Sequence, residues 1–116
     1  MTKDIYTIIP NVQNLVEEIQ TDSITSRSFY KGDGINAILF AFDAGQELSE
    51  HTSSKAAILQ IVNGDATITL GNDTHKVSTG AWIQMPPHLK HSVYADTSLK
   101  MLLLMFDSEK AIPESK

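Results

Sequence analysis

Short turn sequences recur along this chain at nearly regular intervals. KGDG stands at residues 31–34, NGD at 63–65 and GND at 71–73. Gly, Asn and Asp tolerate the positive φ angles of tight hairpins, so each run predicts a turn between two strands. The segments between turns are short and rich in Ile, Val, Thr, Phe and Tyr: residues 24–30, 35–43, 57–62, 66–70, 74–77, 82–85, 92–94 and 99–106. This pattern predicts an all-β antiparallel sandwich or barrel.

The two ends of the chain differ from this pattern. Val12, Leu15, Val16 and Ile19 follow a helical period, which is compatible with a short N-terminal helix or with irregular coil. Residues 107–116 are polar and contain Pro113, so we expect a loosely held C-terminal tail. A length of 116 residues predicts one domain, 1–116, with its strands in residues 24–106.

Composition excludes several classes of protein. The absence of cysteine rules out a disulfide scaffold, a thiolate zinc site and a cysteine nucleophile. A net charge of −5 without a basic cluster argues against nucleic acid and anionic membranes as partners. The longest apolar runs, residues 37–42 and 101–106, are too short to span a bilayer. The sequence MTKD at the start is not an export signal, so we expect a cytoplasmic protein.

Two ordered series of residues carry a resemblance to a known family. The first is Gly45, His51 and Gly64, and the second is Gly80, Pro86 and His91. Their order and spacing resemble the two motifs of the cupin superfamily. The resemblance implies a small single-domain cupin, whose double-stranded jelly-roll β-barrel covers about residues 24–106.

The departures from the cupin motifs concern the metal site. Cupins that bind metal typically use three His and one Glu, and the resemblance places the second His at Ser53 and the Glu at Ala57. His88 stands at a motif Gly, and Ala95 at the closing Asn. With only His51 and His91 left, the motif is degenerate for metal binding.

Two interpretations of this histidine pair follow. In one, His51 and His91 bind one divalent ion (Zn, Ni, Fe or Mn) weakly or substoichiometrically, with Glu47 or His88 as a third donor. In the other, they are metal-free pocket residues hydrogen-bonded to Ser53 or to water. Strand alternation would put Glu47, Ser49 and Ser53 on the face of His51.

The expected ligand pocket surrounds the two histidines. Alternate side chains of a strand share a face, so counting from Ala57 and from His91 gives further inward positions, and a methionine is added because its flexible side chain suits a pocket. The pocket is expected to contain His51, Ser53, Ala57, Leu59, His91, Val93 and Met101. Ala57 in place of a carboxylate predicts a dry pocket with an apolar or weakly polar ligand. We also expect Trp82, and Phe40 or Phe42, to pack between the sheets.

Three functions remain open on the sequence, which does not decide whether the chain is an enzyme. The first is a small-molecule-binding cupin without catalysis. The second is a metal-dependent oxygenase, isomerase or lyase acting on a small organic acid or sugar. The third is a structural or interaction module, because residues 35–42 and 99–106 are apolar on both faces and such a surplus of apolar surface predicts a homodimer.

Overall fold

A computed structural model describes residues 5–107, and within them the chain forms nine strands and one 3-10 helix. The elements are η1 (Val12–Leu15), β1 (Ile24–Gly32), β2 (Ile35–Phe42), β3 (Glu47–His51), β4 (Ala56–Asn63), β5 (Asp65–Leu70), β6 (Asp73–Ser78), β7 (Trp82–Met85), β8 (His91–Ala95) and β9 (Leu99–Phe106). The predicted all-β class is confirmed. No helix among the described residues is long and apolar enough to cross a membrane.

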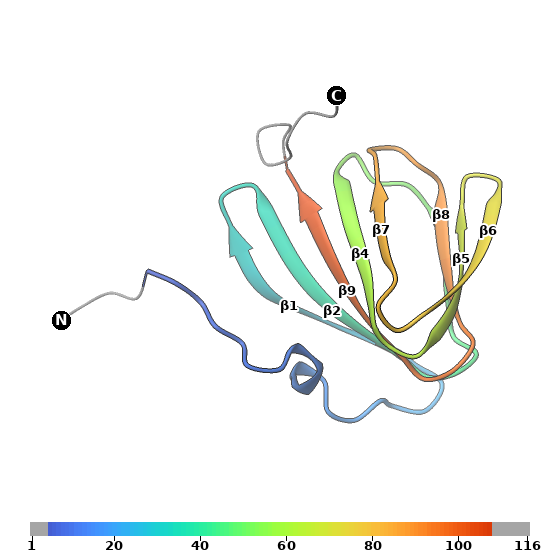
Figure 1. The fold of residues 1–116 in the computed structure, drawn as a ribbon, viewed down its shortest axis with the longest axis horizontal. Coiled ribbons are helices and arrows are strands. Elements are labelled where there is room, and N and C mark those ends of the chain that lie inside the picture. Colours follow the sequence, from blue (N-terminus) through green and yellow to red (C-terminus); the bar gives the residue numbers. More distant parts are fainter. Residues whose placement is uncertain (1–4, 108–116) are drawn as a thin grey trace.

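The strands form two antiparallel sheets that face each other (Figure 1). The larger sheet has the order β1-β2-β9-β4-β7, and the smaller sheet has the order β3-β8-β5-β6. Strands far apart in the sequence are therefore neighbours, as with β2 and β9 or β3 and β8. This nesting confirms the predicted cupin jelly roll.

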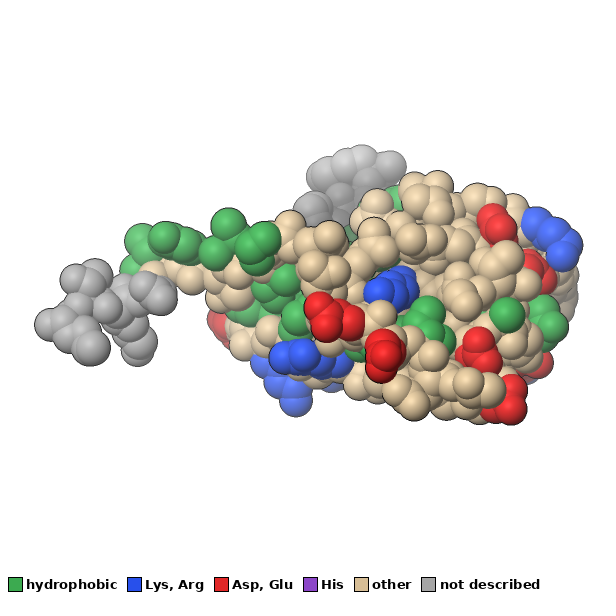
Figure 2. Space-filling model, turned by 90° about the horizontal axis from the view of Figure 1, so that it is seen from below, with side chains coloured by type: hydrophobic (Ala, Val, Ile, Leu, Met, Phe, Trp, Pro, Cys, Tyr) green, Lys and Arg blue, Asp and Glu red, His purple; other side chains and the backbone are tan. Residues whose placement is uncertain are grey.

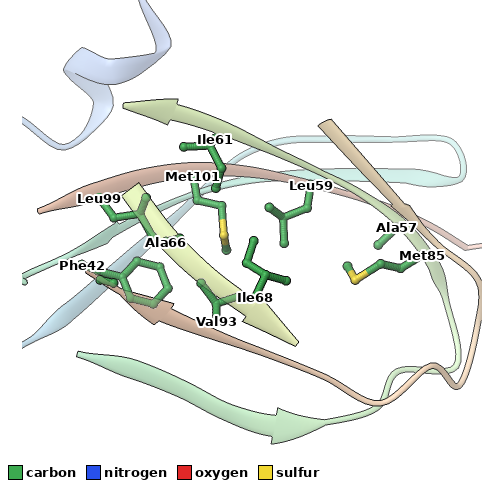
Figure 3. Close-up of a cluster of buried hydrophobic side chains, with 11 residues drawn as sticks. Phe42, Ala57, Leu59, Ile61, Ala66, Ile68, Met85, Val93, Leu99 and Met101 are labelled. Carbon is green, nitrogen blue, oxygen red and sulfur yellow. The ribbon is translucent and has the colours of Figure 1, made fainter. Parts of the chain in front are cut away.

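The main core lies between the two sheets (Figure 3). Phe42 and Leu59 of the larger sheet and Ile68 and Val93 of the smaller one are at most 1% exposed. Trp82 does not join them, because it pairs with Gln60 on the outward face and is 59% exposed. The expected position between the sheets is thus correct for Phe42 and wrong for Trp82.

The N-terminal apolar residues pack outside the core. Only residues Val12–Leu15 are helical, and the Oδ1 of Asn11 accepts a hydrogen bond from the backbone N–H of Gln13 at 3.1 Å. Val16 is buried against Leu39 and Ala41 on the outward face of the larger sheet. The helix is thus a single turn followed by coil. Contacts with the sheet bury these apolar side chains, and a longer helix is not needed for that burial. Of the predicted tail, residues 108–116 lie outside the described residues.

Candidate functional site

Pairing of β3 with β8 brings the two histidines together. His51 and His91 are direct partners in the register, and their ring centroids lie 4.2 Å apart with an angle of 57° between the planes. His51 is exposed at the rim, whereas His91 is half-buried. The sheet therefore builds a compact pair of imidazoles at one end of the barrel.

Backbone carbonyls orient both rings in the same way. Nδ1 of His51 lies 2.8 Å from the Ser49 carbonyl oxygen, and Nδ1 of His91 lies 2.9 Å from the Leu89 carbonyl oxygen. A carbonyl can only accept, so each Nδ1–H donates and the lone pair of a neutral ring stays on Nε2. Each imidazole thus offers Nε2 as an acceptor or as a metal ligand.

A β-bulge in β3 decides which of its residues face inward. Leu48 pairs with the buried Val93, and the register shifts before His51 pairs with His91. The extra residue reverses the alternation, so Leu48 and His51 both face the interior. Glu47 pairs with the exposed Tyr94 and faces outward. The expectation that Glu47 shares the face of His51 is therefore wrong.

A cavity of about 320 Å³ opens beside the histidine pair. Nine of its lining residues are apolar: Ile38, Phe40, Leu48, Ala57, Met85, Pro86, Leu89, Leu103 and Met105. The remaining lining residues are His51, Ser53, Lys55 and His91. The cavity is thus mainly apolar, with its polar groups contributed by β3, β8 and the segment between β3 and β4.

The predicted pocket residues fall into two groups. His51, Ser53, Ala57 and His91 line the cavity. Leu59, Val93 and Met101 do not line it, because they are at most 1% exposed and pack in the closed core beside it. Figure 3 shows large side chains such as Phe42 and Ile68 filling that part of the interior.

Sequence reasoning missed the contribution of β2, and from β9 it assigned Met101 to the pocket in place of the residues that line the cavity. Phe40, Leu103 and Met105 come from these two paired strands and line the cavity. Their inward positions alternate along each strand. Both strands are apolar on both faces, however, so the sequence did not show which face lines the cavity.

His88 contributes through its backbone. It adopts a positive φ of 69°, and its N–H donates to the Ser53 carbonyl oxygen at 2.7 Å. A positive φ is most easily adopted by glycine, which explains why the cupin motif has glycine at this position. The bond ties the loop after β7 to the segment between β3 and β4 at the cavity. His88 does not line the cavity.

The site does not match the metal ligands that the cupin resemblance implies. Within residues 5–107, no three His, Cys, Asp or Glu side chains come close enough to hold one ion. Catalytic zinc sites use about three protein ligands, and here Ala57 and Ser53 supply none. Lys55 also lines the cavity, with its Nζ 2.7 Å from a carboxylate oxygen of Asp107. The described residues therefore do not form the three-histidine, one-glutamate site of metal-binding cupins.

Comparison with known families identifies the chain. Residues 37–113, more than half of the sequence, match the AraC-like ligand-binding domain. The chain belongs to this family. No curated protein matches the sequence. In this AraC-like ligand-binding domain, the cavity lies beside the histidine pair.

Several solved structures share the fold of this AraC-like domain. A conserved protein of unknown function from Streptococcus pyogenes is 29% identical, with a TM-score of 0.79 over 93% of this chain and 94% of that one. A cupin superfamily protein from Desulfitobacterium hafniense is 21% identical, with a TM-score of 0.79 over 91% and 97% of the two chains. Salicylate 1,2-dioxygenase from Pseudoaminobacter salicylatoxidans is 16% identical, with a TM-score of 0.69 over 82% of this chain and 31% of that one. The last two show the fold alone.

Proposed function

We propose that this chain binds a small, largely apolar molecule in the cavity beside His51 and His91, and that it acts as a binding domain without catalysis. The observation that carries the proposal is the cavity itself, which combines about 320 Å³ of space and mainly apolar walls with two oriented imidazoles. Ligand sites of proteins typically have this composition, an apolar enclosure with a few fixed polar groups. Membership in the AraC-like ligand-binding domain family supports it.

The polar groups define the chemistry of the ligand. In the neutral rings of His51 and His91, Nε2 can accept a hydrogen bond, so the pair favours a ligand that carries a hydroxyl or N–H group. Lys55 adds a positive charge that Asp107 partly neutralises. The volume is close to the lower end of the roughly 300–1,000 Å³ found for ligand pockets. A small ring or short alkyl chain with one hydroxyl group satisfies these conditions.

An NMR titration tests this proposal. Phenol serves as the probe with a hydroxyl group, and toluene serves as the probe of the same shape without one. We expect phenol to shift the resonances of Ala57, Leu103 and the two histidines more than toluene does. Ala57→Leu fills the cavity wall and should abolish these shifts, whereas Thr74→Ala on exposed β6 should leave them unchanged.

Thermal unfolding of Ala57→Leu without probe shows whether this variant is folded. Leu89→Phe is a second variant that fills the cavity, because Leu89 is half-buried in the cavity wall. Both are called blocking variants. Phenol shifts that persist in both folded blocking variants would refute the proposed site. So would the absence of any shift in the wild type at millimolar phenol.

A divalent cation at the histidine pair is the second candidate ligand, and it would carry the alternative of a metal-dependent enzyme. The observation in its favour is that both imidazoles use Nδ1 for a backbone carbonyl, and no hydrogen bond within residues 5–107 occupies either Nε2. Two nitrogen ligands hold such an ion weakly. Added Zn²⁺ or Ni²⁺ should therefore raise the melting temperature little, because stabilisation grows as RT ln(1 + [L]/Kd). Stoichiometric metal that is lost in His51→Ala and His91→Ala would favour the enzyme instead.

A further inference from the structure

Lys55 brings a positive charge to the wall of the cavity. Among the described residues that line the cavity, Lys55 is the only lysine or arginine, and none is an aspartate or glutamate. The Lys55 ammonium pairs instead with Asp107, which is not one of the lining residues, and 2.7 Å separates Nζ from a carboxylate oxygen. A cation that faces an apolar cavity, with its counter-ion outside the lining, is complementary to an anionic ligand.

Strand pairing determines where this ion pair lies. Lys55 directly precedes β4 and Asp107 directly follows β9, and these two strands run side by side in opposite directions (Figure 1). Ala56 pairs with Phe106, so the next residue beyond each of them meets its counterpart across the sheet. The two side chains are 41% and 50% exposed, and an ion pair with that much contact with water contributes little to stability. An incoming anion can therefore displace the Asp107 carboxylate from Lys55 at a small cost.

Ser53 supplies a second hydrogen-bond donor to the same cavity. Its Oγ accepts a hydrogen bond from the Lys55 backbone N–H at 3.1 Å, and its carbonyl oxygen accepts one from the His88 N–H at 2.7 Å. These two bonds hold Ser53 in place, and the residue is half-buried and lines the cavity. A hydroxyl that accepts through one lone pair still has its own proton to donate. The Ser53 hydroxyl and the Lys55 ammonium therefore offer two donors, which suit the two acceptor oxygens of a carboxylate.

The negative charge of the whole chain does not cancel this local positive charge. The net charge is −5, and Figure 2, which views the molecule from below, shows acidic side chains at the end of the barrel away from the C-terminal end of β9. The 8 residues of β9 span roughly 25 Å. At physiological ionic strength, exposed charges are largely screened beyond about 8 Å. Asp107 is therefore the carboxylate that competes directly with an anion for Lys55.

We propose that the cavity selects small monocarboxylates, with Lys55 and Ser53 as the residues that bind the carboxylate. On binding, the ligand carboxylate takes the place of Asp107 at the Lys55 ammonium, and the apolar walls surround a single ring or a short branched chain. A second carboxylate on the ligand would be buried among these walls without a partner, which is costly. The inference rests on the proposed function, because it assigns a class of ligand to the same cavity. It adds recognition of charge to the hydrogen bond that the histidine pair can accept.

Two probes of nearly the same shape and different charge test the ligand class. Benzoate is an anion at neutral pH, and benzamide is its neutral counterpart. Dissociation constants from NMR titration should show that the wild type binds benzoate about tenfold more tightly than benzamide, because hydrogen bonds to a charged group are the stronger ones. Lys55→Gln should weaken benzoate binding by about tenfold and leave benzamide binding unchanged. Lys55→Arg keeps the positive charge, and it should keep the preference for benzoate.

Asp107→Asn tests the exchange itself, because it releases Lys55 without altering a lining residue. It should tighten benzoate binding by about threefold and leave benzamide binding unchanged. The Asp107 backbone N–H donates to the Gly34 carbonyl oxygen at 2.9 Å, and this bond survives the substitution. Asp96→Asn is the matched control, because it removes the same charge from the Lys76–Asp96 pair, neither member of which lines the cavity. It should leave benzoate binding unchanged. Asp107→Asn should have no effect on benzoate binding when Lys55→Gln is already present, because the two residues act as one pair.

Two results would overturn the selection of carboxylates. They are equal affinities of the wild type for benzoate and benzamide, and a benzoate affinity that Asp107→Asn leaves at the wild-type value. Melting curves without probe show that each variant is folded, and the wild-type comparison of the two probes needs no variant. If phenol binds while benzoate shows no advantage over benzamide, the inference fails and the proposed function stands. If neither phenol nor benzoate nor benzamide binds, the proposed function fails as well.

Discussion

Gly64 and Gly80 provide a matched pair of substitutions that separates two physical costs. Gly64 lies between β4 and β5 with a φ of 112°, and Gly80 lies between β6 and β7 with a φ of 97°. A Cβ added to Gly64 would overlap the Ser98 carbonyl oxygen and come within 3.1 Å of Thr97 Oγ1. A Cβ added to Gly80 would meet no atom within 4 Å. Both alanines would be strained by φ, but only Gly64→Ala would also collide with the backbone.

The two costs can be estimated separately. Placing an L-residue at such a φ costs about 1–2 kcal/mol of folding free energy. Overpacking adds about 1–3 kcal/mol, and at Gly64 displacement of Thr97 would also disturb the hydrogen bond from the Asp65 N–H to Thr97 Oγ1, 3.0 Å long. We therefore expect Gly80→Ala to lower the free energy of unfolding by about 1–2 kcal/mol, and Gly64→Ala by about 3–4 kcal/mol.

Urea unfolding followed by far-ultraviolet circular dichroism measures this difference. Trp82 is exposed and is a poor reporter of core unfolding, so strand ellipticity is the better signal. Both substitutions restrict the unfolded chain in the same way, and this contribution cancels between them. Equal losses at the two positions, or a larger loss at Gly80, would show that contact with the Ser98 carbonyl does not determine the cost.

Three further substitutions test the core and the cavity. Phe42→Ala should lower the free energy of unfolding in urea by about 3–5 kcal/mol, since the ring is fully buried between the sheets; a loss below 1 kcal/mol would contradict the described core. Lys55→Gln should change the free energy of unfolding by less than ~0.5 kcal/mol, because the side chains of the Lys55–Asp107 pair are 41% and 50% exposed. It should nevertheless weaken the binding of benzoate measured by NMR, because it removes a positive charge from the cavity wall. Ala57→Glu should lower the melting temperature without metal, because it buries a carboxylate among apolar side chains. Zn²⁺ should then raise the melting temperature of Ala57→Glu more than that of the wild type or of Ala57→Gln, and equal shifts would show that position 57 cannot complete a metal site.

Turn chemistry and strand composition agree along the chain, so they were sufficient to predict the all-β class. The turns at Gly34 and Gly71 lie where the structure has positive φ angles, 81° and 62°. Strands begin and end at these turns, and the two motif series locate the strands that carry His51 and His91. Long-range strand order does not follow from turns alone, and it came from the cupin resemblance. Cytoplasmic location and the exclusion of nucleic acid stay predictions.

The limits of the predicted pocket have a physical cause as well. Strand alternation assigns a side chain to a face, but it does not say whether the interior at that depth is filled or open. Leu59 and Val93 face inward as expected, and they are sealed by the packing of Phe42, Ile68 and their neighbours. The volumes of side chains from both sheets decide where space remains. Predicting that space therefore requires the register of every strand, which determines the side chains that meet at each depth.

The β-bulge in β3 links the least predictable feature of the fold to the candidate site. In a regular strand, Leu48 and His51 would face opposite sides, because they are separated by an odd number of positions. The shift between them allows Leu48 to cover the core beside Val93 while His51 still faces His91 and the cavity. A one-residue change of register reverses every side chain beyond it. Without the bulge, the strand could seal the barrel or present the imidazole, but not both. The same irregularity that turns Glu47 away from the face of His51 thus allows a closed core and a histidine-lined cavity to share one short strand.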